Sequence, residues 1–259
     1  MKRQLARILG RAGEMMLGRG DFSVEQKAGH ANYVTTVDKA VEEYLQEELL
    51  RLLPGSVLIG EEQKNEPLTD APTWVVDPID GTTNFIHNYR ASAVSVALVE
   101  GGRPVVGAVY QPYARELYWA QLGKGADCNG EPLHVTANPL PRALVGFGTA
   151  PYNEELAQRS MELALHFLRA AADVRRCGSA ALDLAYVASG RQDAFFELIL
   201  NPWDYAAGAL LVTEAGGRFA MPALAAPSFG VSTAILAANA ACFEGALDIL
   251  RQHGVQPVR

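Results

Sequence analysis

Two stretches near the N-terminus place apolar residues at the spacing of a helix. In the first stretch, apolar residues recur in steps of three and four, at Leu5, Ile8, Leu9, Ala12, Met15 and Met16. This pattern predicts an amphipathic helix packed on a core. The second stretch, 39–53, repeats the pattern and stops at Pro54-Gly55, as helices commonly do. The polar, glycine-containing residues 18–32 between the two stretches predict a loop.

Short apolar runs in the first half of the chain predict strands. They cover 56–59, 74–76, 93–100, 104–111 and 116–120. Turn signals separate the later runs, at Gly101-Gly102, at Pro112-Tyr113 and, beyond the last run, at Asn129-Gly130. Asn-Gly is a strong hairpin signal, so these runs predict a meander of antiparallel strands.

The second half alternates strands with helices. Strands are predicted at 144–147, 173–176, 194–198, 217–220 and 234–238, and helices at 153–171, 178–190, 203–215 and 240–252. Residues 221–232, rich in proline and alanine, predict a surface loop. The proline-rich stretch 138–141 is the best candidate boundary. We therefore expect one α/β domain over 1–259, with an α+β sub-lobe at 1–140 and an α/β sub-lobe at 141–259.

The motif at 74–85, W-V-V-D-P-I-D-G-T-T-N-F, ends an apolar run at a carboxylate. Pro78 fixes φ and removes a hydrogen-bond donor, so the chain is expected to leave the strand there. Thr82-Thr83 are candidate N-cap residues of a new helix, whose N-terminus would suit a phosphate. Asp77 and Asp80 then share one turn, where they repel unless a cation lies between them. Carboxylate oxygens are preferred ligands of Mg²⁺.

Taken alone, an Asp-Pro-x-Asp sequence is more often an ordinary turn with solvated aspartates. Two further carboxylate signals favour a metal site. Glu61-Glu62 follow the predicted strand 56–59, and Asp204 stands at the start of the predicted helix 203–215. Three such element ends can converge on one cluster of cations.

Composition narrows the partners and the compartment. The 259 residues carry a net charge of −7 with a pI of about 5.3, which predicts no direct nucleic-acid binding. The three cysteines have no disulfide or metal spacing, and the five histidines have no ligand spacing. No uninterrupted signal-peptide segment or long apolar run is found, so we expect a cytoplasmic protein without a membrane partner.

D-P-I-D-G-T-T-N-F, the upstream G-E-E and the downstream W-D-x-A-A-G resemble the inositol monophosphatase family of Mg²⁺-dependent phosphatases. The motifs follow the order and spacing of that family, and the resemblance covers nearly the whole chain. It implies the layered αβαβα sandwich of the inositol monophosphatase and fructose-1,6-bisphosphatase type. It also implies a homodimer and inhibition by lithium.

The resemblance implies two to three Mg²⁺ ions, with Mn²⁺ as a substitute. The first metal would be held by Glu61, Asp77 and the backbone carbonyl of Ile79, and the second by Asp77, Asp80 and Asp204. A third, weaker ion would depend on Glu61. Metal is required because a phosphate monoester dianion repels hydroxide, and a bound metal lowers the pKa of water and neutralises phosphoryl oxygens.

Catalytic roles follow by the same resemblance. Thr82 would orient the attacking water, supported by Asp38 and Glu61, and the N–H groups of Gly81 and Thr82 would hold phosphate. Asp38 matches an aspartate that hydrogen-bonds this threonine. It also stands at or beside the predicted start of the second helix, where a plain N-cap role is the alternative. A plain cap is the alternative for Thr82 as well.

Substrate contacts are implied at both sub-lobes. Asp80 and Asp204 would border the substrate, and Gly178, Ser179 and Ala180 match a helix N-terminus that touches the polyol. Glu197 matches a carboxylate that binds a sugar hydroxyl, with an exposed strand-end glutamate as the alternative. Lys27 matches a basic residue of a mobile loop near the third metal, and a solvated lysine is the other interpretation.

The predicted reaction is hydrolysis of a small polyol phosphate, inositol 1-phosphate first, by metal-activated water. Fructose 1,6-bisphosphate, histidinol phosphate and NADP are alternative substrates within the superfamily. The T-T-N-F ending argues against 3′-phosphoadenosine 5′-phosphate, since relatives acting on nucleotides typically have T-K-E-F. A non-enzymatic alternative is an interaction protein that binds the transcription machinery. The complete ligand set argues against a purely non-catalytic role.

Overall fold

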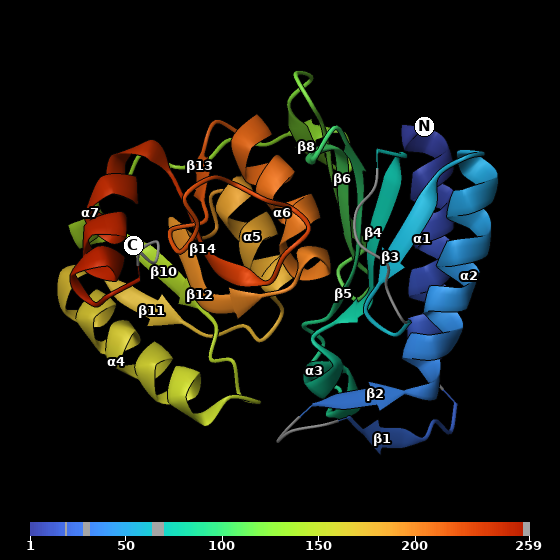
Figure 1. Cartoon of the computed structure of the whole chain (residues 1–259), viewed down its shortest axis with the longest axis horizontal. Coiled ribbons are helices and arrows are strands. Elements are labelled where there is room, and N and C mark those ends of the chain that lie inside the picture. The colour runs from blue at the N-terminus through green and yellow to red at the C-terminus, as the bar shows by residue number, and fades with distance from the viewer. Residues whose placement is uncertain (19, 28–31, 64–69, 256–259) are drawn as a thin grey trace.

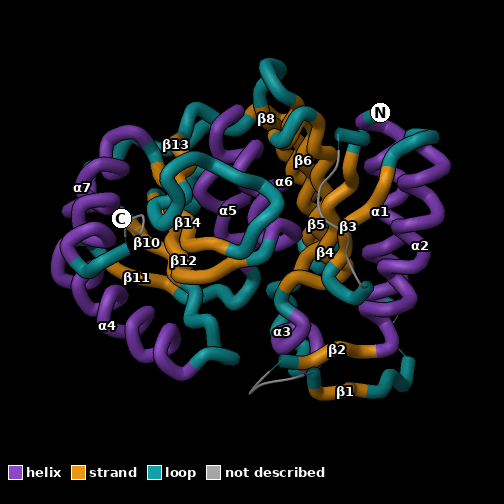
Figure 2. The backbone as a smooth tube through the Cα atoms, viewed as in Figure 1, coloured by secondary structure: helices purple, strands orange, loops and turns teal. Residues whose placement is uncertain are grey.

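Five layers of alternating helices and sheets make up the computed structural model, which describes residues 1–18, 20–27, 32–63 and 70–255 (Figure 1). One outer layer is α1 (Lys2–Leu17) and α2 (Thr36–Leu52), and the other is α4 (Glu154–Ala170) and α7 (Ala240–Gln252). Helices α5 (Ala180–Ala188) and α6 (Pro202–Glu214) lie between two sheets (Figure 2). The predicted αβαβα sandwich is confirmed.

The first sheet has seven strands in sequential order, with β3 and β4 parallel and all later neighbours antiparallel. Its strands are β3 (Val57–Gly60), β4 (Thr73–Asp80), β5 (Ala93–Glu100), β6 (Arg103–Gln111), β7 (Glu116–Gln121), β8 (Ala126–Cys128) and β9 (Glu131–Pro132). The predicted hairpin at Asn129-Gly130 joins β8 to β9, and both turn residues have positive φ.

The second sheet has the order β11-β10-β12-β14-β13. Its strands are β10 (Leu144–Phe147), β11 (Asp173–Arg175), β12 (Ala194–Leu200), β13 (Arg218–Ala220) and β14 (Thr233–Ala238). Strand β10 pairs in parallel with β11 and β12, while β14 runs antiparallel to β12 and β13. The predicted boundary near residue 140 falls on the short helix η1 (Leu140–Arg142), between the two sheets in sequence. The division into two sub-lobes stays a prediction.

Glycines let helix α6 pack closely against its neighbouring elements. A Cβ on Gly208 would lie 2.4 Å from Cβ of Leu184 in α5, and one on Gly107 of β6 would lie 2.7 Å from the carbonyl oxygen of Ala207. These glycines allow α6 to approach both α5 and the first sheet. The N-terminus of α6, with Asp204, is thereby fixed beside β4.

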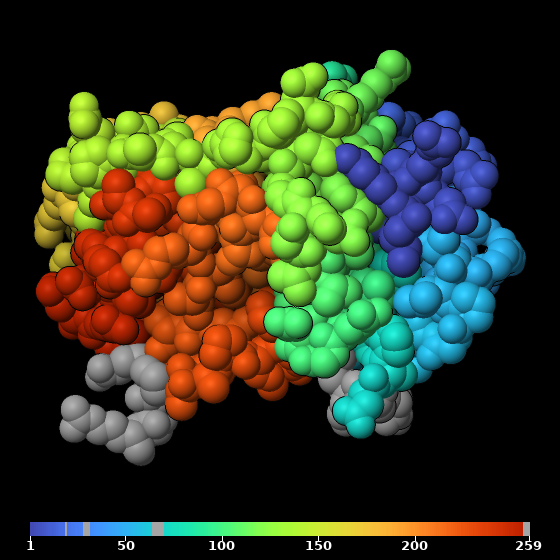
Figure 3. Space-filling model, turned by 90° about the horizontal axis from the view of Figure 1, so that it is seen from above, coloured from blue at the N-terminus to red at the C-terminus, as the bar shows by residue number. Residues whose placement is uncertain are grey.

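The face seen from above has the N-terminal helices at one end and the C-terminal residues at the other, with the green segment of β6–β9 between them (Figure 3). Within the described ranges, none of the helices combines the length and the apolar character needed to cross a bilayer.

One stretch predicted as loop contains a strand. Within 18–32, β1 (Val24–Gln26) pairs antiparallel with β2 (Tyr33–Thr35), so the loop prediction is wrong at β1. Its three residues are all exposed, so no alternation of apolar and polar positions marks the strand in the sequence. Residues 19 and 28–31 lie outside the described part of the chain.

The start of α2 differs from the prediction by three residues. Thr35, rather than Asp38, is the N-cap, and Asp38 occupies the third helical position. The Thr35 side chain accepts from the N–H of Asp38, while an Asp38 oxygen accepts from the Thr35 N–H at 2.8 Å. This reciprocal pair is a capping box, which satisfies two donors of the first helical turn.

The chain does not leave β4 at Pro78, contrary to expectation. The strand continues to Asp80, and its register with β5 shifts between Asp77 and Asp80. Pro78 lies within this irregularity, where a missing N–H removes no ladder hydrogen bond. The helix that follows, α3 (Thr82–Ile86), has Gly81 as its N-cap, with φ +87°, instead of a threonine.

Candidate active site

The irregularity in β4 turns Asp77 and Asp80 to the same side. Asp77 is opposite Ser95 and Asp80 is opposite Ala93, so between these two pairs β4 contains one more residue than β5. Residues three apart on a regular strand point to opposite faces, and a β-bulge with one extra residue removes that difference. The Ile79 N–H donates to Asp77 Oδ1 at 2.9 Å and fixes the carboxylate.

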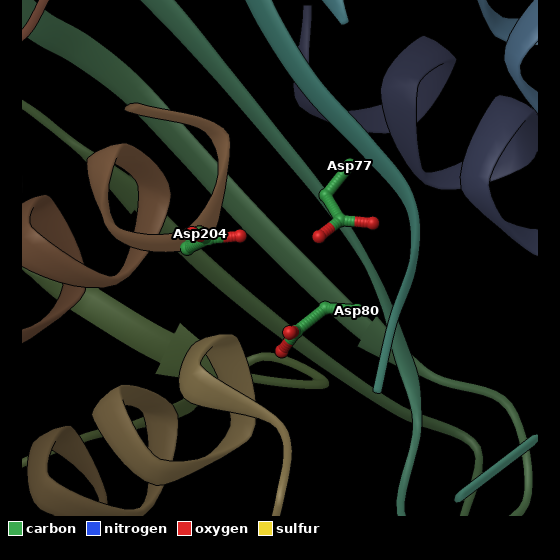
Figure 4. Close-up of side chains that lie close together, drawn as sticks. All are labelled: Asp77, Asp80 and Asp204. Carbon is green, nitrogen blue, oxygen red and sulfur yellow. The ribbon is translucent and has the colours of Figure 1, made fainter. Parts of the chain in front are cut away.

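Asp204 joins these two carboxylates from the first turn of α6. Its Oδ2 accepts from the N–H of Asn201, the N-cap, at 2.7 Å, which orients the side chain. Asp77, Asp80 and Asp204 each place a carboxylate oxygen within 4.8 Å of the other two (Figure 4). Two elements far apart in the sequence, β4 and α6, therefore build one cluster.

The three carboxylates lack a cation of the protein's own. Among the described residues, no lysine, arginine or histidine forms a salt bridge with Asp77, Asp80 or Asp204. Burial, followed by repulsion from neighbouring carboxylates, raises the pKa of Asp77 and of Asp204 well above the usual range. A buried, oxygen-only set without a counter-ion fits a hard divalent cation such as Mg²⁺.

Asp80 also contacts the N-terminus of α5. It accepts hydrogen bonds from the Ser179 hydroxyl and from the Ala181 N–H, the latter at 2.7 Å. Burial raises the pKa of Asp80 to about 6, and these donors oppose the rise. A Cβ on Gly81 would lie 3.0 Å from the carbonyl oxygen of Gly178, so the starts of α3 and α5 meet at this point.

Thr82 lies beside the cluster and contacts Asp38. Its hydroxyl is 3.2 Å from Asp38 Oδ1 and 3.2 Å from the carbonyl oxygen of Ile79. The expected Asp38–Thr82 contact is therefore present, and Asp38 also retains its capping role at Thr35. Asp38 is fully buried, and burial raises its pKa.

Glu61 is bound to a lysine. Lys27 Nζ lies 2.9 Å from Glu61 Oε1 and 2.6 Å from Glu62 Oε1. The Glu62 N–H in turn donates to Glu42 of α2 at 2.9 Å, and burial raises the pKa of Glu62 to about 7. Glu61 lines the same cavity as the three aspartates but is outside their 4.8 Å group.

A cavity of about 460 Å³ extends from the carboxylates toward the second sheet. Every residue predicted to bind metal or substrate lines it, from both sheets and from the starts of α5 and α6. Glu197 is half-buried, so the alternative of an exposed strand-end glutamate is wrong. Its Oε1 accepts from the Ala150 N–H at 3.3 Å, and burial raises its pKa to about 7. Asp38 stands behind this wall and reaches it through Thr82.

Four further residues belong to this region and were missed from the sequence. Tyr152, Arg176 and Asp183 line the cavity, and Gln192 holds Asp183 from behind. Asp183 follows Ser179 by four residues on one helix, which places both on the same face. That spacing was a usable signal for Asp183. The loop residue Tyr152 and the pre-strand residue Gln192 have no comparable pattern.

The fold and the carboxylate cluster together define a phosphatase, a phosphoric monoester hydrolase. The sequence model of the inositol monophosphatase family matches residues 2–254, and the chain belongs to this metal-dependent family. It is 44% identical over 191 residues to the Nus factor SuhB of Escherichia coli (strain K12) and to the inositol-1-monophosphatase of Rhizobium meliloti (strain 1021). Both alignments cover 73% of this chain and 72% of the relative.

Solved structures agree with this assignment. The extragenic suppressor protein suhB of Bartonella henselae superposes with a TM-score of 0.88 and 31% identity, covering 97% of this chain and 98% of the other. An IMPase/NADP phosphatase complexed with Mg²⁺ and phosphate gives a TM-score of 0.84 at 27% identity, covering 96% and 93%.

Proposed function

We propose that this phosphatase hydrolyses a small polyol phosphate monoester, inositol 1-phosphate first, and that it depends on Mg²⁺. The observation that carries the proposal is the cluster of Asp77, Asp80 and Asp204, which is without a salt bridge among the described residues and opens into the cavity. The relative named inositol-1-monophosphatase supports the substrate, and the Mg²⁺-complexed neighbour supports the metal.

Two ions would be held by this chain, with a third, weaker one at Glu61, and Mn²⁺ would substitute. Glu61, Asp77 and the carbonyl of Ile79 would hold the first, and Asp77, Asp80 and Asp204 the second. When bound, Mg²⁺ lowers the pKa of a coordinated water molecule and neutralises charge on the phosphoryl oxygens. Ile79 fits this role because it lines the cavity, with its N–H bonded to Asp77 and its carbonyl oxygen 3.2 Å from the Thr82 hydroxyl.

Thr82 orients the attacking water. Its single hydroxyl proton is donated to Asp38 Oδ1 or to the Ile79 carbonyl oxygen, each 3.2 Å away, so the lone pairs of Thr82 Oγ1 are available to a water proton. Asp38 is fixed in turn by the Thr35 N–H at 2.8 Å. The backbone N–H groups of Gly81 and Thr82, at the cavity wall, bind phosphate oxygens.

The leaving group occupies the other half of the cavity. Gly178, Ser179 and Ala180 border it at the start of α5, and Glu197 faces it from β12. The carboxylate of Glu197 accepts a hydrogen bond from a hydroxyl of the polyol, and Asp80 and Asp204 border the ester. A site built to bind a hydroxyl discriminates strongly against analogues without it.

The test is phosphate release by the purified enzyme from inositol 1-phosphate, fructose 1,6-bisphosphate, histidinol phosphate and NADP. Each ester is assayed with Mg²⁺, with a chelator and with added Li⁺. The proposal expects inositol 1-phosphate to have the highest kcat/KM, with turnover lost on chelation and inhibited by Li⁺. A higher kcat/KM for another ester would overturn the substrate, and turnover that survives chelation would overturn the metal dependence.

Two further proposals concern assembly and place. We infer that the protein is a homodimer and that it is located in the cytoplasm. The described cysteines, Cys128, Cys177 and Cys242, are free thiols, which supports a reducing compartment. Light scattering of the purified protein tests the dimer, and a monomer mass would contradict it.

A second candidate function is binding to the transcription machinery, which the relative named Nus factor SuhB favours. A pull-down of RNA polymerase by the wild type and by Asp77→Asn tests it. Equal recovery by both proteins would support a role separate from catalysis, and no recovery by either would refute it.

A further inference from the structure

Two glycines leave one face of β10 bare where it borders the cavity. Gly146 and Gly148 are two residues apart, so they face the same side of the strand and its extension. A Cβ on Gly146 would lie 2.2 Å from Gln192 Oε1 and 3.2 Å from Asp183 Oδ1. One on Gly148 would lie 1.9 Å from the carboxyl carbon of Glu197. Three polar side chains therefore fill the space that two side chains of β10 would occupy.

Asp183 reaches this wall from α5. It follows Ser179 by one helical turn on the same face, and Ser179 donates to Asp80, so Asp183 lies on the leaving-group side of the cavity. The residue is 1% exposed, and its carboxyl group forms no salt bridge with any described cation. The charged groups that act on it are Glu197 and Asp80, which repel it, and Arg176, which attracts it less strongly.

Gln192 supplies the partner of this acid. It is 5% exposed, and its Nε2 donates to Asp183 Oδ1 at 2.8 Å. Its Oε1 is buried without a hydrogen-bond partner among the described residues. A buried acceptor without a donor is costly, and a proton on the Asp183 carboxyl group supplies that donor. Burial also raises the pKa of Asp183 well above the usual range, in the direction that retains this proton.

We propose that Asp183 is a neutral carboxylic acid paired with the side-chain amide of Gln192, and that this pair positions Glu197 as the acceptor for a hydroxyl of the leaving group. The role assigned to Glu197 rests on the proposed polyol phosphatase activity. The protonation of Asp183 does not.

The pair has a physical consequence for Glu197. Glu197 and Asp183 repel each other electrostatically, and a proton shared between two interacting carboxyl groups would occupy the oxygen that the substrate hydroxyl needs. The amide of Gln192 already donates to Asp183 Oδ1, and its own unpartnered Oε1 is the acceptor that the proposal assigns to the acidic proton in place of Glu197. Asp183 and Gln192 are thus positioning residues, and Glu197 makes the contact with substrate.

Infrared difference spectroscopy of the wild type against Asp183→Asn tests the protonation directly, in the full chain and with Mg²⁺ present. The proposal expects the carbonyl band of a protonated carboxylic acid at neutral pH, sensitive to deuterium exchange and absent from the variant. A carboxylate band at that position in the difference spectrum would overturn it. This result is independent of which ester the enzyme hydrolyses.

Gln192→Leu tests the positioning role, because leucine fills similar space without the amide. We expect the ratio of kcat/KM for inositol 1-phosphate to that for 4-nitrophenyl phosphate to fall about fivefold to tenfold, chiefly through KM, the amount expected for one weakened hydrogen bond. Gln158→Leu, on the exposed face of α4, is the matched control. An unchanged ratio in a folded Gln192→Leu protein would overturn the role. Absence of wild-type turnover on inositol 1-phosphate would refute the proposed function, while the infrared result still decides the state of Asp183.

Discussion

Lys27 and Glu61 form an ion pair at the edge of the carboxylate cluster, with Nζ 2.9 Å from Oε1. The same ammonium group lies 2.6 Å from Glu62 Oε1. The ammonium group of Lys27 therefore binds Glu61, which the proposed mechanism assigns as a ligand of the first and third metal ions. Lysine and the proposed metal ions would therefore compete for one carboxylate.

We expect Lys27→Gln to bind Mg²⁺ more tightly. Removing the lysine relieves both its competition for Glu61 and its repulsion of the incoming cation, an effect of about 1 kcal/mol for a partly exposed pair. The Mg²⁺ concentration for half-maximal activity should fall by about fivefold. Lys39→Gln, which removes an exposed pair with Glu25, is the control. A higher Mg²⁺ requirement in Lys27→Gln would mean that Lys27 assists the metal site.

Asp77→Asn should abolish turnover while the protein stays folded. Asp77 is assigned to both metals, so its loss is expected to lower kcat by about a thousandfold or more, equivalent to about 4 kcal/mol of barrier. The metal-free variant should unfold at the same temperature as the wild type or higher, since a repelled, buried carboxylate has been neutralised. Asp173→Asn at an exposed ion pair is the matched control. Near-normal phosphate release by Asp77→Asn would contradict the mechanism.

The stability of the metal-free protein should fall as pH rises. The pKa of Asp80 is raised to about 6 by burial, so the folded state holds a proton that the unfolded state releases near pH 4. Stability from this group is complete below pH 4 and is lost between pH 4 and 6, by an amount on the order of 3 kcal/mol. The raised pKa values of Asp77 and Asp204 extend the loss to higher pH.

Saturating Mg²⁺ should remove most of this slope, because the metal replaces the protons as the counter-charge. Thermal melts from pH 4 to 8 with chelator and with Mg²⁺ measure the difference. Equal slopes in the two series would show that the carboxylates are not the metal ligands.

Thr82→Ala should lower kcat by about a hundredfold with little change in KM, since the hydroxyl positions water and not substrate. Thr82→Ser retains the donor to Asp38 and should recover most of the rate. Steady-state kinetics on inositol 1-phosphate separate the two variants. If serine were as impaired as alanine, the contact with Asp38 would not be the reason for the role of Thr82.

Several features of the site were accessible from the sequence because each is local. The run Trp74–Val76 and its carboxylate, the short helix after Gly81 and the acid in the first turn of α6 are all written within a few residues. The order of strands and helices predicted an α/β chain, and the layered sandwich was implied by the family resemblance alone. The bulge in β4 was missed. In its local sequence Pro78 indicates the end of a strand, and only the pairing of β4 with β5 shows that the strand continues past it.

The wall around Glu197 was beyond the sequence for a different reason. Asp183 lies in α5 and Gln192 nine residues later in the segment before β12, and their contact requires the space left by Gly146 of β10. The ion pair of Lys27 with Glu61 likewise joins positions 34 residues apart. Periodicity and turn chemistry describe single elements, whereas these pairs depend on how the elements pack.

Calorimetric titration of Mg²⁺ into the metal-free wild type and Asp204→Asn tests the central claim most directly. Of the three clustered aspartates, Asp204 is the one that α6 contributes, and the account assigns it to the second ion only. We predict that the wild type binds at least two ions and that the variant loses one of them while retaining the ion at Glu61 and Asp77. The same stoichiometry and affinities in both proteins would contradict the account.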